Sequence, residues 1–215
     1  MAGVPQPAII TPQEWLAAAP RHRPELAGPP VRGLLHGTAG HHAEIENPRN
    51  ESRGEFLRYC RAMQDFHMAA LPRGRGWADA GQNFTIGRNG LIAVGRRYSL
   101  AAAKVGLTVV AAHCLGQNDQ YGVELEHAGN EPPTPAQLDA YVKLMAWLFS
   151  RCGARPTELH GHRDYYATAC PTPSLYDRLP RLRGAVAHEL NRHGRDPASR
   201  LERARFRARY RAGLA

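Results

Sequence analysis

Residues 161–171, GHRDYYATACP, place a histidine and a cysteine eight positions apart, a pair that neither composition nor core packing requires. Zinc in proteins takes three or four nitrogen, sulfur or oxygen ligands, and a catalytic zinc keeps one position for water. His36 lies near the end of the segment VRGLLHG (31–37), and His162 follows TELHG (157–161); both segments are expected to be strands. Two imidazoles and the thiolate of Cys170 therefore form a candidate zinc site with three protein ligands. The soft thiolate favours zinc over magnesium or calcium.

Each of these residues has a more ordinary interpretation when it is taken alone. A single histidine at a strand end is commonly a hydrogen-bonded structural residue, and a single cysteine is commonly a small core residue. Spacing by itself leaves other histidines as competing ligands, namely His41, His42, His113 and His160.

The elements that must position these residues alternate between strands and helices. Apolar residues at helical spacing predict a helix from about residue 52, and TPAQLDAYVKLMAWLFSRCG predicts a capped helix over 134–153. A hairpin is expected over 82–95 around Asn89-Gly90. Short helices are expected at 11–19 and from 172, and further strands at 31–37, 106–114, 120–128 and near 157–161. This alternation predicts an α/β fold, a single domain with a central mixed β-sheet flanked by α-helices.

The bulk composition, with 43% hydrophobic and 22% charged residues, is ordinary for a globular domain. No apolar run reaches the roughly 18 residues that a membrane helix needs, so no transmembrane segment is expected. The first residues show neither a basic n-region nor a continuous apolar h-region, so we expect no classical signal peptide and synthesis in the cytoplasm. The four cysteines are widely spaced, which favours free thiols or metal ligands over a disulfide framework.

The positive charge is concentrated near the end of the chain. From residue 181 onward there are ten arginines and three acidic residues, a net charge of +7 out of +9 for the whole chain. We therefore expect a catalytic domain over 1–182 and an Arg-rich C-terminal helix or tail over 183–215. Arginines that alternate with period two weaken the helix prediction. This segment is either a solvated end of the chain or a surface that contacts anionic cell-envelope polymers or a membrane. The sequence shows no nucleic-acid recognition fold, so we expect no specific nucleic-acid partner.

Several motifs occur in a characteristic order: IITPQEWLAAAP, LLHGTAG, MQDFHM, GWADAGQNFTIGRNGLIAVGR, AAHCLGQN, GVELEHAGN and GHRDYYATACP. Over about residues 9–182 this series resembles the type 2 N-acetylmuramoyl-L-alanine amidases, the superfamily of peptidoglycan recognition proteins and phage lysozyme-amidases. The resemblance implies Zn²⁺ bound by His36, His162 and Cys170, and peptidoglycan or a muropeptide as substrate.

The catalytic base depends on which branch of the superfamily the chain follows. Recognition-protein amidases have a tyrosine in DIGYNF, and the matching DAGQNF here places Gln82 there, which cannot titrate. Amidases that resemble the cytosolic anhydromuropeptide-recycling enzymes use a glutamate of a GIELEG strand instead. GVELEHAG here places Glu124 at that position. The alternative is that Glu124 is a surface strand residue, on the same face as Glu126.

The resemblance also suggests roles around the cleft. Thr168, two positions before the cysteine, is expected near the oxyanion of the attacked carbonyl, with loop capping as the alternative. His113 is expected to line the substrate cleft or to be structural. Asn83 and Gln82 are candidate substrate contacts, and Trp77 is either a contact or a packing residue.

The leading hypothesis is a zinc-dependent amidase that cleaves the bond between N-acetylmuramic acid and L-alanine. The charge of the C-terminal segment favours an endolysin, made in the cytoplasm and acting on the cell wall after release. The alternatives are a cytosolic muropeptide-recycling amidase and a non-catalytic peptidoglycan-binding module.

Overall fold

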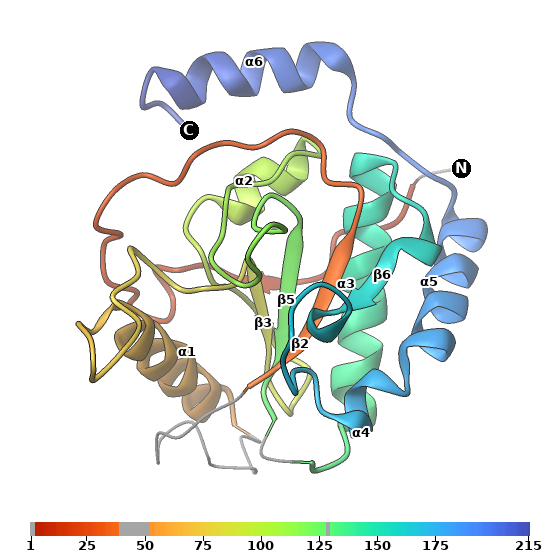
Figure 1. The fold of residues 1–215 in the computed structure, drawn as a ribbon. Helices are drawn as coiled ribbons and strands as arrows, with labels where there is room; N and C mark the ends of the chain where they lie inside the picture. Colours follow the sequence, from red (N-terminus) through yellow and green to blue (C-terminus); the bar gives the residue numbers. More distant parts are fainter. Residues whose placement is uncertain (1–2, 39–51, 128–129) are drawn as a thin grey trace.

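The computed structural model describes residues 3–38, 52–127 and 130–215, so His41 and His42 lie outside the described residues. At its centre is a six-stranded sheet in the order β1-β4-β3-β5-β2-β6 (Figure 1). β3 and β4 pair antiparallel, and the other neighbouring strands pair parallel. The predicted mixed sheet is confirmed. The strands are β1 (Ile9–Ile10), β2 (Gly33–Gly37), β3 (Phe84–Ile86), β4 (Ile92–Val94), β5 (Tyr121–Leu125) and β6 (Leu159–Gly161).

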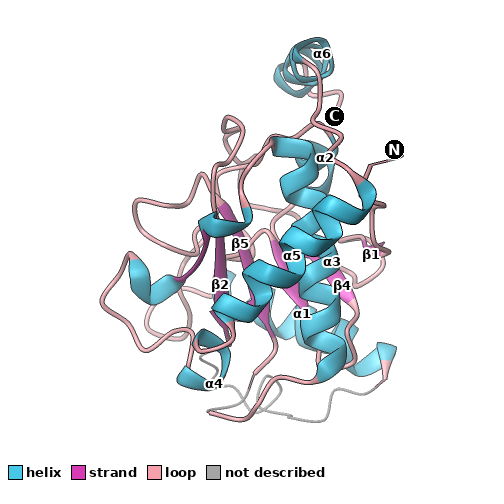
Figure 2. Ribbon diagram, turned by 90° about the vertical axis from the view of Figure 1, so that its right-hand side faces the viewer, coloured by secondary structure: helices cyan, strands magenta, loops and turns pink. Residues whose placement is uncertain are grey.

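Helices cover both faces of this sheet. α1 packs on one face, to the left of the strands in Figure 1, while α3 and α5 form a layer on the other. In Figure 2, α3 and α5 lie in front of the strands. The predicted α/β domain with flanking helices is therefore confirmed. The helices are α1 (Arg53–Met68), α2 (Ser99–Lys104), α3 (Pro135–Cys152), α4 (Pro173–Tyr176), α5 (Leu179–His193) and α6 (Arg200–Arg211), with 3-10 turns at Pro156–Glu158 and His162–Asp164.

The helices α1 and α3 begin where their sequences predict. Ser52 caps α1 through a reciprocal capping box with Glu55, and Thr134 caps α3 in the same way with Gln137. Gly153 ends α3 with a φ of 90°, a left-handed conformation that glycine adopts without a steric penalty. The hairpin is also confirmed, with Gly90 at a φ of 80° in its turn.

Two predicted elements are wrong. Residues 11–19 form turns rather than a helix: Glu14 accepts the expected bond from Thr11 at 2.8 Å, but Leu16 then takes a φ of 58°, which ends helical propagation. Residues 106–114 form only an isolated bridge between Val109 and Leu26. The apolar residues there are buried against α2 and α6 instead of pairing in the sheet, which explains their strand-like composition.

The C-terminal segment is helical. α5 packs on α3 through Leu182, Val186 and Leu190, so it belongs to the main core and spans the boundary expected at residue 182; that boundary stays a prediction. α6 begins with a capping box between Ser199 and Glu202. Its alternating arginines do not prevent a helix, because arginine has high helix propensity and most of these side chains are exposed. No helix in the described ranges is long and apolar enough to cross a membrane.

Candidate active site

The register of three neighbouring strands assembles the site on one face of the sheet. His36 of β2 pairs with Glu124 of β5, and Glu124 pairs with Thr85 of β3. Because side chains alternate along a strand, these three residues share a face, and the neighbouring Leu35 and Val123 point into the core beneath α3. The site therefore lies on the side of the sheet that α1 covers.

The three predicted zinc ligands meet at one point. His36 comes from β2, His162 directly follows β6, and Cys170 lies in the loop before α4. One ligand atom from each residue lies within 4.8 Å of the other two, and Cys170 Sγ is 3.7 Å from His36 Nδ1. The strands thus bring together residues that are 134 positions apart in the chain.

The hydrogen bonds of the histidines fit a metal in this cluster. His113 Nε2 donates to the carbonyl oxygen of Gln120 at 3.2 Å, so His113 Nδ1 is unprotonated and accepts from His36 Nε2 at 3.1 Å. This arrangement leaves His36 Nδ1, the atom nearest Cys170 Sγ, without a proton. His162 Nδ1 is buried and has no hydrogen-bond partner among the described residues. An unprotonated nitrogen of His36, a ring nitrogen of His162 and the sulfur of Cys170 therefore lie together, and this donor set fits a zinc site with an open fourth position.

Burial sets the protonation of these groups. It lowers the pKa of His36 well below its usual value, with smaller contributions from His113 and His162, and it lowers the pKa of His113 to about 4. The same cause lowers the pKa of His162. Neutral imidazole is the form that binds a metal. Burial raises the pKa of the Cys170 thiol to about 12, so a nearby cation is needed for it to lose its proton.

Glu124 lines the same pocket, a cavity of about 180 Å³ that also contacts the three candidate ligands. Tyr59 Oη donates to Glu124 Oε1 at 3.2 Å, and Thr38 Oγ1 donates to it at 3.5 Å. Burial raises the pKa of Glu124 to about 7, and these two hydrogen bonds oppose the shift. A carboxyl group with such a pKa exchanges protons readily near neutral pH, which suits a general base.

Glu126 has a different environment. It follows the end of β5, is buried, and does not line the pocket. Its Oε2 accepts the backbone N–H of Arg88 at 3.3 Å, and its own carbonyl accepts from Gln137 at 2.7 Å. Of the two glutamates considered from the sequence, the structure places only Glu124 beside the metal ligands.

The remaining predicted residues divide between the pocket and its surroundings. Thr168 lines the pocket, and its Oγ1 accepts from the backbone N–H of Cys170 at 3.2 Å, which leaves the hydroxyl proton available. Gln82 also lines it, but its Nε2 donates to Thr85 Oγ1 at 2.7 Å. Asn83 does not reach the pocket: it is fully buried, and its side chain bonds Ser99, Thr108, Val109 and Gly122.

His113 lines the pocket, yet both its ring nitrogens are used within the protein. It orients His36, so its hydrogen bonds favour the structural alternative over a substrate contact.

Sequence reasoning missed Tyr59 and Thr38, the two donors to Glu124. Thr38 lies in the LLHGTAG motif, which provides a signal, whereas in the sequence Tyr59 is only one of the residues at helical spacing that predict the helix from about residue 52. It also missed Arg75 and His67 in the pocket wall. His67 stacks on Trp77 with ring centroids 4.8 Å apart, and the Arg75 guanidinium lies 6.0 Å from the Trp77 ring.

Comparison with known families agrees with this geometry. The sequence model of the N-acetylmuramoyl-L-alanine amidase family matches residues 28–173, which include all three candidate metal ligands and Glu124. The chain belongs to the N-acetylmuramoyl-L-alanine amidase family.

Some relatives of the chain are named as amidases, and others are named as peptidoglycan recognition proteins. The chain is 32% identical over 179 residues to the human N-acetylmuramoyl-L-alanine amidase; this match covers 80% of the chain and 28% of the human protein. It is 29% identical over 181 residues to Drosophila melanogaster peptidoglycan-recognition protein LB, covering 82% of the chain and 69% of that protein. The chain thus spans less than a third of the human relative.

Solved structures confirm the amidase fold. Drosophila peptidoglycan recognition protein LB superposes with a TM-score of 0.64 at 29% identity, covering 80% of the chain and 92% of that structure. Peptidoglycan recognition protein LE, solved with tracheal cytotoxin, a monomeric diaminopimelic acid-type peptidoglycan, gives 0.63 at 28% identity, covering 81% and 93%. An endolysin amidase from Clostridium intestinale shares the fold, with a TM-score of 0.58 at 20% identity, covering 83% and 97%.

Proposed function

We propose that this protein is a zinc-dependent amidase that hydrolyses the amide bond between N-acetylmuramic acid and L-alanine in peptidoglycan. One observation carries the proposal: Glu124, with a pKa of about 7, shares a pocket with the converging His36, His162 and Cys170. Family membership and the muropeptide bound by a structural relative support the substrate class.

The residues of the pocket divide the chemistry between them. A zinc ion held by His36, His162 and Cys170 would supply Lewis-acid chemistry to the scissile amide. The Glu124 carboxylate accepts a proton from the attacking water and returns it to the nitrogen of the leaving L-alanine. The Thr168 hydroxyl donates to the oxygen of the attacked carbonyl as negative charge develops there.

By the resemblance of DAGQNF to DIGYNF, Gln82 stands where recognition-protein amidases have a tyrosine. Its amide is engaged with Thr85 and does not titrate, so in this proposal Gln82 shapes the pocket and takes no part in proton transfer. Glu124, the one carboxylate among the described residues that line the pocket, takes over that task.

The biological role that we propose is wall lysis by an endolysin-like enzyme, which is made in the cytoplasm and acts on the cell wall after release. The exposed arginines of α6 support it, since they suit a contact with anionic cell-envelope polymers or a membrane. Recycling of soluble muropeptides and recognition without cleavage are the competing functions.

The test compares intact peptidoglycan sacculi with soluble muropeptides as substrates, using mass spectrometry of the products. Native protein is expected to release peptides with free L-alanine amino termini from sacculi. Glu124→Gln is expected to lower the rate by about 10²- to 10⁴-fold while zinc content stays the same, because it removes only proton transfer. The matched control is Glu126→Gln, in which a neighbouring carboxylate outside the pocket is neutralised.

The outcomes separate the functions. Cleavage of soluble muropeptides without release from sacculi identifies the recycling enzyme. Muropeptide binding with no cleavage of either substrate identifies a recognition protein and rejects the role of Glu124.

A further inference from the structure

A second pocket, of about 630 Å³, lies between α2, α6 and the segment that follows β1. We call it the α2–α6 pocket. Its volume is in the range of small-molecule sites. It shares no lining residue with the candidate active site. In Figure 1, α2 and α6 lie at the top, and β2 runs down and away from them.

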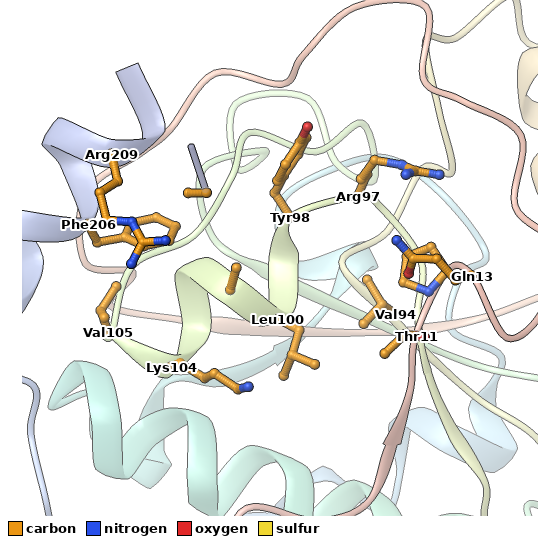
Figure 3. Close-up of a pocket in the computed structure, with 13 residues that line it drawn as sticks. Thr11, Gln13, Val94, Arg97, Tyr98, Leu100, Lys104, Val105, Phe206 and Arg209 are labelled. Carbon is orange, nitrogen blue, oxygen red and sulfur yellow. The ribbon is translucent and has the colours of Figure 1, made fainter. Parts of the chain in front are cut away.

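The walls of the α2–α6 pocket are largely apolar. Val94 comes from β4, Leu100 and Val105 from α2 and its end, and Phe206 from α6 (Figure 3). Leu100, Val105 and Phe206 are only half-buried, so the pocket presents apolar surface to solvent. Covering such surface with an apolar group is favourable.

Three cations surround these apolar walls. Arg97, Lys104 and Arg209 approach the pocket from three sides (Figure 3), and among the described residues no Asp or Glu side chain lines it. Among the described residues none of the three makes an ion pair; Arg97 and Arg209 donate instead to the carbonyl oxygens of Ala18 and Leu214. Within the described ranges these three cations are therefore not paired with a carboxylate side chain.

α6 adds further positive charge beside the pocket. The helix contacts the domain along one stripe: Tyr210 Oη donates to Pro24 O at 2.6 Å, Phe206 packs near it, and Arg203 donates to Val105 O at 3.3 Å. The other arginines of the helix are exposed: Arg200, Arg205, Arg207, Arg209 and Arg211. α6 thus presents a cationic surface next to an apolar hollow.

We propose that the α2–α6 pocket binds an anionic phospholipid, with one acyl chain against Leu100, Val105 and Phe206 and the headgroup on the surrounding cations. The two features together select this ligand. A purely anionic polymer would leave the apolar walls uncovered, and a neutral lipid would leave the cations unpaired. Membrane-surface helices combine apolar burial with attraction to anionic lipids in this way, and the arginines of α6 contact neighbouring headgroups.

The first test is flotation of the whole chain with vesicles of phosphatidylglycerol and phosphatidylcholine, or of phosphatidylcholine alone. Binding to the anionic vesicles only is expected, and it weakens at high salt. The double variant Lys104→Gln/Arg209→Gln is expected to lose affinity about 25-fold, at about fivefold for each cation removed near an anionic surface. The matched control is Arg58→Gln/Arg73→Gln, which removes two exposed cations elsewhere.

The second test locates the acyl chain. Phosphatidylglycerol with a photoreactive group on one chain is expected to label peptides from residues 94–105 and 206–209. Equal binding to phosphatidylcholine vesicles, equal losses in both double variants, or labelling confined to other segments would each overturn the proposal.

The lipid site and the amidase function are tested separately. Glu124→Gln is expected to bind the anionic vesicles as the native protein does, and Lys104→Gln/Arg209→Gln is expected to cleave soluble muropeptides at the native rate. Failure of lipid binding therefore leaves the proposed function unaffected, and the reverse also holds.

Discussion

The polar groups of the candidate active site are buried and hydrogen-bonded to one another, whereas cations beside the α2–α6 pocket are exposed and make no ion pair within the described ranges. In the active site His36 is buried, His113 orients it, and Glu124 accepts bonds from Tyr59 and Thr38. Around the α2–α6 pocket, Lys104 and Arg209 are exposed and make no ion pair within the described ranges.

The difference follows from what each region must do. Bond cleavage needs atoms that are fixed within fractions of an ångström. The paired strands β2, β5 and β3, together with buried hydrogen bonds, provide that precision. Contact with a lipid surface needs positive charge and apolar area, but it does not need precisely placed atoms. Flexible side chains on α2 and α6 are therefore sufficient. Substitutions should therefore affect the two regions independently.

Loss of a metal ligand is expected to have the largest effect. Cys170→Ala removes the only sulfur in the cluster, so the protein should lose its zinc and its cleavage activity together. The same result is expected after treatment of the native protein with a chelator. Metal analysis and the muropeptide assay measure both, with Cys152→Ala as a control for a thiol outside the pocket. Retention of one zinc per chain by Cys170→Ala would disprove the assignment.

A smaller effect is expected at His113, which contacts His36 and positions its ring. His113→Ala should weaken zinc affinity by about 10- to 100-fold, because a metal-binding histidine loses the partner that sets its tautomer. Competition with a chromophoric chelator measures this change. His188→Ala, at an exposed position on α5, is the control and should bind zinc normally. A native affinity in His113→Ala would mean that the hydrogen bond does not orient His36.

The hydrogen bond to Glu124 is expected to affect pH dependence more than maximal rate. Burial raises the pKa of Glu124 to about 7, and the bond from Tyr59 lowers it. Since the base must be ionised, activity rises as pH increases through this pKa. Tyr59→Phe should move that rise to higher pH by less than about one unit. The cleavage activity of this variant should therefore fall furthest below that of the native protein at pH values under 7. Tyr98→Phe is the control, and identical pH profiles for the native protein and Tyr59→Phe would reject the contact.

The smallest effect is expected where α6 meets the domain. Tyr210→Phe removes the hydrogen bond to Pro24 O and should lower the free energy of unfolding of the α6 contact by about 1 kcal/mol. Hydrogen exchange of residues 200–211 measures this change. Muropeptide cleavage should stay at the native rate; a decrease would show that the two regions are coupled.

Much of the architecture could be predicted from local pattern. The caps at Ser52 and Thr134, the Asn89-Gly90 turn and the alternation of strands and helices each depend on neighbouring residues, which the sequence displays directly. The errors at 11–19 and 106–114 have the opposite cause. There, the backbone conformation of Leu16 and the burial of apolar residues against α2 and α6 override local propensity.

In the candidate active site, too, some residues could be predicted from the sequence and others could not. Motif order identified His36, His162, Cys170 and Glu124, and the structure brings all four into one pocket. Asn83 looked equivalent in sequence, but it is fully buried outside that pocket. An asparagine beside a glutamine in a motif does not reveal which side chain faces the cavity, because that depends on the path of the strand.

By itself, the sequence determined the ligand types, the candidate base, the mixed fold and the concentration of positive charge after residue 180. The fold and the charge follow from residue pattern and composition along the chain, whereas the ligands and the base follow from the resemblance of the motifs to those of the amidases. Only the tertiary structure decided that His113 orients His36, that Tyr59 and Thr38 contact Glu124, and that α6 forms one wall of an apolar pocket with α2. Each of these contacts joins segments that are distant in sequence, and burial between them sets the protonation and exposure on which function depends.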